Sequence, residues 1–257
     1  MDLIAETISH RFDALDVLHD VSFTVGAGEV VAIVGPSGCG KSTLLSILGG
    51  LLQPTAGRAL LRGAPPPGSL NPLTFVFQDF ALLPWASVAE NVAFPLLHTP
   101  QSALQRAAAV DDALGRTRLL DFRAVFPKQL SGGMRQRVGI ARALVVRPAI
   151  LLMDEPLSAL DSQTRELLME DFVDLLADGT MGAVYVTHNL EEAVRLADRI
   201  VVLSRRPGRI RKVVSVPVKR RERDEASVRT QLLELQNELW SLIRTEAIDA
   251  EREVQHA

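Results

Sequence analysis

The residues that bear most directly on chemistry form one glycine-rich segment near the N-terminus. They are Gly35, Pro36, Ser37, Gly38, Cys39, Gly40, Lys41, Ser42 and Thr43. They match the pattern G-x-x-x-x-G-K-[ST] in full and lie between the apolar run Val30–Val34 and a helical pattern over Lys41–Leu52. Glycines let the backbone wrap around an anion, with N–H groups and the positive end of the following helix directed at it. We therefore expect a nucleotide phosphate site in which Lys41 reaches the β- and γ-phosphates and the Ser42 hydroxyl ligates Mg²⁺.

Two adjacent carboxylates follow a second apolar run. The strand pattern of Ile150–Met153 delivers Asp154 and Glu155 at its carboxyl end, the edge where open α/β sheets bind ligands. We expect Asp154 to hold the magnesium ion through its water shell and Glu155 to polarise a water for in-line attack on the γ-phosphate. Without other evidence, two adjacent carboxylates at this position are better explained as part of the turn that ends the strand. The complete phosphate loop in the same chain favours the catalytic interpretation.

A third segment offers another anion-receptive helix start. Ser131-Gly132-Gly133 precedes a basic segment, and propensity predicts a helix over Arg135–Val146. Those three residues alone support an ordinary N-cap with a flexible turn about equally well.

The order of apolar and polar segments predicts the fold class. Alternation over Leu3–Val25, with a turn at Asp13–Asp16, predicts N-terminal strands. Further predicted strands cover Leu73–Phe77, Ala183–Val186 and Ile200–Leu203, and predicted helices cover Ser102–Leu120, Ser162–Ala177 and Leu190–Ala197. We therefore predict an α/β fold: a P-loop NTPase core with a mostly parallel sheet flanked by helices, an N-terminal antiparallel β subdomain and a helical subdomain at about residues 84–135.

The composition changes near residue 219. A mixed-charge run, Lys219–Glu225, precedes apolar residues spaced by three and four at Val228, Leu232, Leu235, Leu239 and Leu242. We divide the chain into an ATPase domain at 1–218 and an amphipathic helical extension at 219–257, and we expect the extension to pack on its own domain rather than on a second copy. The basic residues could attract anionic lipid, but the interleaved acids favour a solvated helix start.

Composition excludes several classes of protein. The 257 residues include 28 Lys and Arg against 31 Asp and Glu, a net charge of −3, so no basic surface indicates a nucleic-acid partner. A single cysteine excludes a disulfide framework, and without a nearby histidine Cys39 is expected to be only a small loop residue. No apolar stretch approaches the roughly 20 residues of a membrane span, and Met1–Ile8 does not resemble a secretory signal.

The chemically active segments, in this order, resemble the ATP-binding cassette of ABC transporters. The resemblance spans roughly Leu3–Leu203 and rests on Gly35–Thr43, Gln78, Leu130–Arg137, Ile150–Glu155, Ser158–Asp161 and His188. The Leu-Ser-Gly-Gly-x-x-Gln-Arg element shortly before the acidic strand is highly specific to that family. The resemblance implies an ATPase that uses ATP and Mg²⁺.

The resemblance assigns roles to further residues. Phe12 stands where the family places an aromatic that stacks on adenine, although a half-buried strand aromatic fits nearly as well. Gln78 is similar to the glutamine that contacts Mg²⁺ and the attacking water and moves with the transport subunit. His188 is similar to the residue that senses the γ-phosphate, whereas a lone histidine at a strand end would indicate only a surface residue.

The resemblance also divides each site between two chains. Ser131, Gly132 and Gly133 would close over the γ-phosphate of ATP bound to a second copy, and Gln136 belongs to the same nucleotide-binding motif. Asp161 would contact the phosphate loop of the opposite copy and can also cap the helix that follows it. The implied assembly is a head-to-tail dimer that sandwiches two ATP molecules and loosens when hydrolysis removes the γ-phosphate.

Softer features resemble importers for nitrate, sulfonates and taurine, notably Val76–Trp85. Leu157, Ser158 and Asn189 depart from the usual residues of that group. The resemblance implies an energy-coupling subunit at the cytoplasmic face of the inner membrane, bound to integral-membrane permease subunits and served by an external solute-binding protein. Trp85 and Phe80 could anchor a permease helix, and burial in the core is an equal alternative.

Three other functions fit parts of the sequence. A soluble ABC-type ATPase in DNA repair or translation usually has two cassettes or a long coiled coil, but only 131 − 78 = 53 positions separate Gln78 from Ser131. A P-loop small-molecule kinase would leave the Leu130–Arg137 element without a role. An exporter subunit remains a variant of the transport interpretation.

Overall fold

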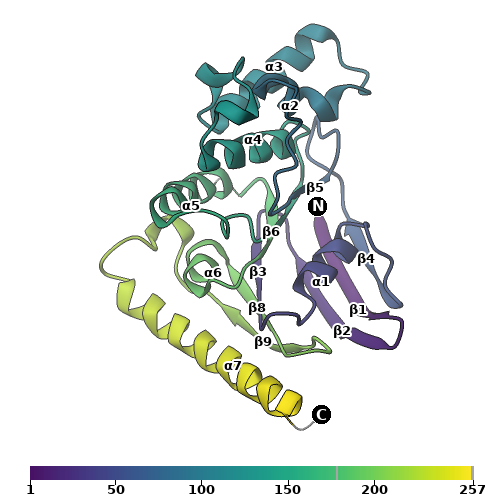
Figure 1. Ribbon diagram of the computed structural model, residues 1–257, viewed down its shortest axis with the longest axis vertical. Coiled ribbons are helices and arrows are strands. Elements are labelled where there is room, and N and C mark those ends of the chain that lie inside the picture. The colour runs from purple at the N-terminus through teal and green to yellow at the C-terminus, as the bar shows by residue number, and fades with distance from the viewer. Residues whose placement is uncertain (178, 256–257) are drawn as a thin grey trace.

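A six-stranded sheet forms the centre of the computed structural model, which describes residues 1–177 and 179–255 (Figure 1). In spatial order its strands are β5 (Leu73–Val76), β6 (Ile150–Asp154), β7 (Gly182–Val186), β3 (Val30–Val34), β8 (Arg199–Leu203) and β9 (Ile210–Ser215). Every neighbouring pair is parallel except β8 and β9. Parallel strands place their carboxyl ends at one edge, so this topology determines where the loops after β3, β6 and β7 meet.

The central strands are buried on both faces, which explains their continuous apolar sequences. All five residues of β3 and of β7 are buried. Val30, Ala32 and Val34 face a core shared with helices α5 (Ser162–Leu176) and α6 (Leu190–Leu196). Val31 and Ile33 face a second core, shared with helix α1 (Lys41–Leu48) and the N-terminal strands. The phosphate loop thus joins a rigid strand to a packed helix.

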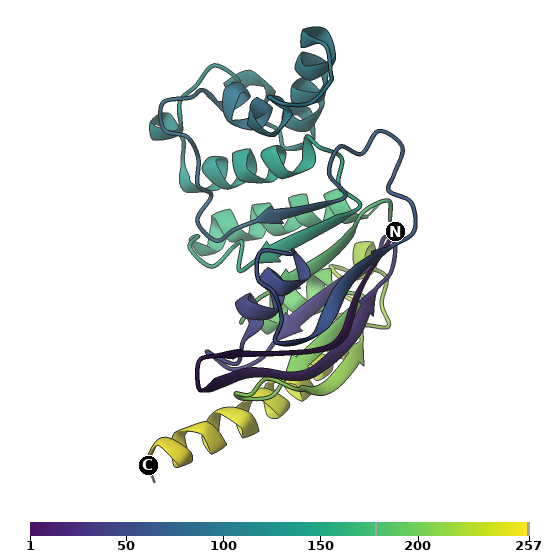
Figure 2. The same cartoon turned by 90° about the vertical axis from the view of Figure 1, so that its right-hand side faces the viewer.

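A separate three-stranded antiparallel sheet lies beside α1 (Figure 2). Its order is β2 (Leu15–Val25), β1 (Asp2–Phe12) and β4 (Ala56–Arg62). The predicted N-terminal strands are present, but β4 was not predicted because its residues are exposed or half-buried. The sheet packs its inner face on the second core, so β1 and β2 are fixed relative to the phosphate loop.

Three helices form the helical subdomain at the end of the molecule opposite the C-terminus (Figure 1). They are α2 (Val88–Ala93), α3 (Ala103–Arg116) and α4 (Gly132–Leu144), with short 3₁₀ turns at Phe94–Leu96, Leu120–Phe122 and Pro127–Gln129. Their own apolar cluster continues into α4, where Val138 and Ala141 are buried. Ser87 and Ser102 begin α2 and α3 with capping boxes.

Several helix ends differ from the predicted ones for identifiable reasons. Helix α4 begins three residues earlier than predicted, because the Ser131 side chain accepts a hydrogen bond from the Met134 N–H and caps it. Helix α1 ends at Leu48 rather than at residue 52, because Gly49 and Gly50 follow it. Helix α3 ends at Arg116, four residues short of the prediction.

The C-terminal segment packs on the domain that precedes it, as predicted. After a 3₁₀ turn at Arg220–Glu222, helix α7 (Arg229–Gln255) crosses the end of the molecule away from the helical subdomain (Figure 1). Leu239 is fully buried in the core beneath α5 and α6, and Leu232, Leu235, Leu242 and Ile243 pack around it. Within the described part of the chain, none of the helices combines the length and the apolar character that a membrane crossing requires.

Candidate nucleotide-binding site

The phosphate loop, Gly35–Gly40, connects β3 to α1 and needs glycine at two positions for different reasons. A β-carbon at Gly35 would lie 2.9 Å from the Leu203 carbonyl oxygen and 3.0 Å from Cys39 Sγ. Gly40 has φ = 101°, a left-handed conformation that other residues rarely adopt. The backbone at Gly40 turns directly into α1, so the N-terminus of that helix faces the concave side of the loop.

The ammonium group of Lys41 lies against the loop. Lys41 Nζ donates hydrogen bonds of 3.0 Å to the carbonyl oxygens of both Gly35 and Pro36, and the residue is buried. Cys39 is buried beneath the loop, and burial raises the pKa of its thiol against the opposing charge of Lys41. The thiol is therefore protonated and inaccessible, as expected for a small loop residue. Lys41 supplies the positive charge that a phosphate chain would meet.

A hydroxyl and a carboxylate meet next to the loop. Ser42 Oγ, in the first turn of α1, donates a 3.1 Å hydrogen bond to Asp154 Oδ1 at the end of β6. Burial raises the pKa of Asp154, with the Ser42 hydrogen bond opposing that effect and the charge of Glu155 adding to it. Two hard oxygen donors at the mouth of a phosphate loop fit Mg²⁺, which proteins usually bind through one or two side chains together with substrate phosphates.

The second carboxylate of the acid pair contacts a histidine from the adjacent strand. Glu155 Oε2 lies 2.9 Å from His188 Nδ1, and the Glu155 N–H donates to the Val186 carbonyl at the same distance. Glu155 has φ = 45°, which turns its side chain out of the line of β6. For a residue with a β-carbon this conformation costs about 1–2 kcal/mol, so the surrounding structure imposes it. Because β6 and β7 are neighbours, the glutamate and the histidine reach the same edge of the sheet.

Two predicted residues lie at the margins of this group. Gln78 is exposed just beyond β5, the strand next to β6. Phe12 ends β1 on the antiparallel sheet, and its ring is 48% exposed, with its centroid 4.5 Å from that of the buried His10. A half-exposed ring offers a free face for stacking.

The Ser-Gly-Gly segment opens α4, on the helical subdomain. Gly133 packs so tightly on α5 that a β-carbon there would overlap Thr164. Gln136, one turn further on, is fully buried, and among the described residues its amide has no hydrogen-bond partner. In the part of the chain that the structure describes, no hydrogen bond joins Ser131 or Gly132 to the phosphate loop.

Asp161 performs the capping role that its position predicts. It accepts hydrogen bonds from the Thr164 N–H at 3.0 Å and from the Thr164 hydroxyl at 2.7 Å, and so begins α5. These bonds lower the pKa of Asp161. The carboxylate is exposed and ionised at neutral pH, so it remains accessible from outside the chain.

The loop after β5 contains Phe80 and Trp85, which the sequence allowed either as core residues or as anchors for a permease helix. Trp85 is 75% exposed and is therefore not a core residue. Phe80 is half-buried against Gly139 of α4, and its carbonyl accepts a hydrogen bond from Arg142 of the same helix. The loop that carries Gln78 is thus tied to α4, and α4 begins with the Ser-Gly-Gly segment.

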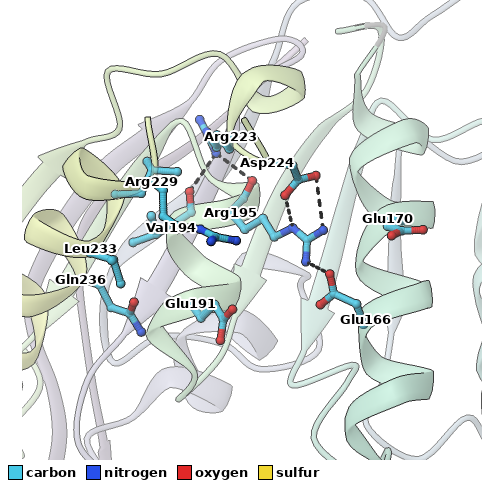
Figure 3. Close-up of a pocket in the computed structure, with 11 residues that line it drawn as sticks. Glu166, Glu170, Glu191, Val194, Arg195, Arg223, Asp224, Arg229, Leu233 and Gln236 are labelled. Carbon is cyan, nitrogen blue, oxygen red and sulfur yellow. Dashed lines mark hydrogen bonds and ion pairs between the residues drawn. The ribbon is translucent and has the colours of Figure 1, made fainter. Parts of the chain in front are cut away.

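A cavity of about 490 Å³ lies away from the phosphate loop, between α5, α6 and the start of α7 (Figure 3). Arg195 crosses it and pairs with both Glu166 on α5 and Asp224 before α7. The buried Arg223 donates to the backbone carbonyls of Val194 and Arg195. These contacts hold the C-terminal segment against α5 and α6, and no sequence pattern predicted them.

The sheet topology and the site together define a protein that binds a nucleoside triphosphate. The chain matches the ABC transporter family over residues 18–158 and belongs to that family. It is 47% identical to the taurine import ATP-binding protein TauB of Burkholderia pseudomallei (strain 1710b) over 207 residues, 80% of each chain. It is 41% identical to the aliphatic sulfonates import ATP-binding protein SsuB 1 of Xanthomonas axonopodis pv. citri over 236 residues, 90% of this chain and 94% of that protein.

A solved structure supports the same assignment. The dimeric post-hydrolysis state of the ATP-binding cassette MJ0796 bound to ADP and Pi aligns with a TM-score of 0.71 and 32% identity. The alignment covers 84% of this chain and 99% of that one. The predicted fold class and the family resemblance are therefore confirmed.

Proposed function

We propose that this chain hydrolyses ATP and thereby drives an ABC importer. The observation that carries the proposal is the grouping of Lys41, Ser42, Asp154, Glu155 and His188 at the carboxyl edge of one parallel sheet. Each residue provides a group that phosphoryl transfer to water requires: a cation, two Mg²⁺ ligands, an acceptor for the water proton and a contact for the γ-phosphate.

The residues of the chain divide the reaction between them. The backbone N–H groups of the phosphate loop, which Pro36 lacks, and the Lys41 ammonium bind and orient the phosphates. Ser42 and Asp154, with Gln78 nearby, would hold Mg²⁺, which would supply positive charge to the phosphates. Glu155 accepts a hydrogen bond from the attacking water, and His188, held by that same carboxylate, is directed toward the γ-phosphate. Phe12 offers its exposed face to the adenine ring.

We further propose that two copies complete each other's sites. Ser131, Gly132 and Gly133 of one copy, with Gln136 behind them, would close over the ATP bound to the other, and Asp161 would contact the opposite phosphate loop. The dimeric cassette MJ0796 supports this assembly, as does the separation of the Ser-Gly-Gly segment from the phosphate loop within one chain. ATP then shifts the population from open to closed dimers, and hydrolysis reverses the shift.

The proposed cargo is taurine, an alkanesulfonate or a related small anion. The support is the 47% and 41% identity to chains named for taurine and sulfonate import. The complex would comprise this subunit at the cytoplasmic face of the inner membrane, integral-membrane permease subunits and an external solute-binding protein, without nucleic acid. The exposed Trp85, on the loop tied to α4, is the proposed anchor for a permease helix.

One measurement tests the proposed ATPase activity, and a second tests the proposed cargo. Purified chain should release phosphate from ATP in the presence of Mg²⁺, and no release would contradict the catalytic assignment. In the host organism, deletion of the gene should abolish uptake of labelled taurine or alkanesulfonate, and the wild-type gene should restore it. Normal uptake of both compounds in the deletion strain would reject the cargo and leave the ATPase assignment intact.

A further inference from the structure

A buried carboxylate lies directly behind the proposed γ-phosphate contact. Glu192, in the first turn of α6, is only 5% exposed. Its Oε2 atom accepts hydrogen bonds of 2.8 Å from the Tyr185 hydroxyl and from the Thr187 hydroxyl. Burying a carboxylate at this depth is costly unless it is hydrogen-bonded, and both hydroxyls meet that need on Oε2.

The first half of this network positions the turn that carries His188. The Thr187 hydroxyl donates to Glu192 and accepts a 2.9 Å hydrogen bond from the Asn189 N–H, so both neighbours of His188 are fixed. Burial, followed by the charge of Glu192, raises the pKa of Tyr185 well above its ordinary value, which keeps its hydroxyl protonated as a donor. Glu192 thus ties the end of β7 to the first turn of α6, which Asn189 caps.

The second half of the network reaches the segment that precedes α5. Arg165 on α5 donates a 2.9 Å hydrogen bond to the Leu160 carbonyl, immediately before Asp161. Its Nε atom lies 3.9 Å from Glu192 Oε1. A second ion pair joins the same helices with the charges exchanged. Its acid, Glu166, is on α5 and its base, Arg195, is on α6 (Figure 3). Arg165 and Glu166, near the start of α5, therefore link that helix to both ends of α6.

We propose that Glu192 is a positioning residue that couples the His188 turn to the Leu160–Asp161 segment through Arg165. The proposal rests on the proposed ATPase function. The two coupled segments belong to different sites of the proposed dimer. His188 lies beside Glu155 in the site of its own chain, whereas the exposed Asp161 would contact the site of the second copy. A change at either segment is transmitted to the other through two hydroxyl hydrogen bonds, one carboxylate and one guanidinium.

The geometry leaves room for this coupling to tighten. Arg165 Nε is buried and has no hydrogen-bond partner among the described residues, and its distance to Glu192 is too long for a hydrogen bond. A movement of α5 toward α6 by about 1 Å would convert the ion pair into a charge-assisted hydrogen bond of ordinary length. In the proposed closed dimer a second copy would contact Asp161, and we assign the shorter Arg165–Glu192 distance to that state.

Glu192→Gln tests the proposal with little change in volume. The amide oxygen can still accept from the two hydroxyls, whereas the amide nitrogen cannot pair with Arg165. We expect kcat for ATP to fall roughly 10- to 100-fold, the effect of displacing a group near the reacting atoms by about 1 Å. Affinity for ATP and thermal stability should stay close to wild type. Glu191→Gln, at the exposed neighbouring position on α6, is the matched control.

Arg165→Lys provides an independent variant at a half-exposed position, where folding is less at risk. It should lower kcat by a similar factor, and the double variant should be no slower than the slower single variant, because both remove the same link. Independent, multiplicative losses would overturn the proposal, as would wild-type turnover in Glu192→Gln. If the wild-type chain itself does not hydrolyse ATP, the proposed function fails and this inference fails with it.

Discussion

Glu155 combines three structural features. It has a left-handed backbone, it contacts His188, and its side chain remains partly exposed at the mouth of the phosphate loop. Replacing the carboxylate with its amide keeps the shape and removes the proton acceptor. Glu155→Gln should bind ATP like wild type and lose at least about 100-fold in kcat, the range of a general base.

Phosphate release and nucleotide titration of the purified variant check this prediction. Glu170→Gln, at an exposed site on α5, should behave like wild type in both measurements. Unchanged turnover in Glu155→Gln would remove Glu155 from the catalytic role.

Asp154 makes stability depend on pH. Burial raises the pKa of its carboxyl, so the folded chain holds that proton more tightly than the unfolded chain. This contribution to stability is complete below the ordinary aspartate pKa and is lost as the pH rises through the raised value. Above it, the ionised carboxylate opposes folding of the nucleotide-free chain.

Asp154→Asn removes that charge and keeps an acceptor for the Ser42 hydroxyl. The variant should have a higher Tm than wild type near neutral pH, and the difference should shrink toward about pH 4, the ordinary aspartate range. The rise in Tm produced by Mg·ATP should be smaller in the variant, because a proposed metal ligand is lost. A Tm advantage that grows toward acid pH would contradict the argument.

At the scale of elements, α7 offers a clear test of whether the C-terminal helix belongs to the folded domain. Leu239 is fully buried in the main core, whereas Leu233, two turns away, is 52% exposed. Leu239→Ala should lower the free energy of unfolding by about 2–5 kcal/mol. Leu233→Ala should change it by no more than about 0.5 kcal/mol, the usual range for exposed sites. Urea unfolding measures both changes in the free energy of unfolding. Equally small changes in the two variants would show that α7 unfolds separately from the rest of the domain.

The sequence predicted the elements whose patterns are strongest. Strands β3, β6 and β7 are continuous apolar runs because both of their faces are covered, and they were found within a residue or two. Strands β4 and β9 escaped prediction because they lie at sheet edges, where exposed residues such as Arg62 and Lys212 interrupt the pattern. The start of α4 was misplaced because glycines have low helix propensity, and the Ser131 cap overrides it.

The candidate site was predictable only in part. The phosphate loop and the Asp154–Glu155 pair have sequence patterns specific enough to find. The contact between Glu155 and His188 depends on β6 and β7 being neighbours, which is a property of the topology and not of either segment. Glu192 gave no signal, because a glutamate in the first turn of a helix usually indicates only a favourable helix dipole. Its burial against Tyr185 becomes visible only in three dimensions.

At the scale of the whole molecule, the two halves of the proposed site are built on different parts of the fold. The phosphate loop is built on the central sheet, and the Ser-Gly-Gly segment is built on the helical subdomain, which has its own apolar cluster. The loop carrying Gln78 and Phe80 joins them and contacts α4 through Arg142. Helix α4 also packs on the main core through Ile140, Ala143 and Leu144, so it links the two parts.

The last prediction separates nucleotide binding from dimer formation. Ser131→Arg places a bulky cation where a second copy's nucleotide would lie, in a background of Glu155→Gln that prevents hydrolysis. ATP affinity of the single chain should be unchanged, because Ser131 does not contact its own phosphate loop. The ATP-dependent dimer should disappear in size-exclusion chromatography with light scattering. Ser102→Arg is the control, because it removes an equivalent helix cap on α3, at about 1 kcal/mol, without approaching either half of the site. A Ser131→Arg chain that still dimerises with ATP would show that the Ser-Gly-Gly segment does not complete the site of a second copy.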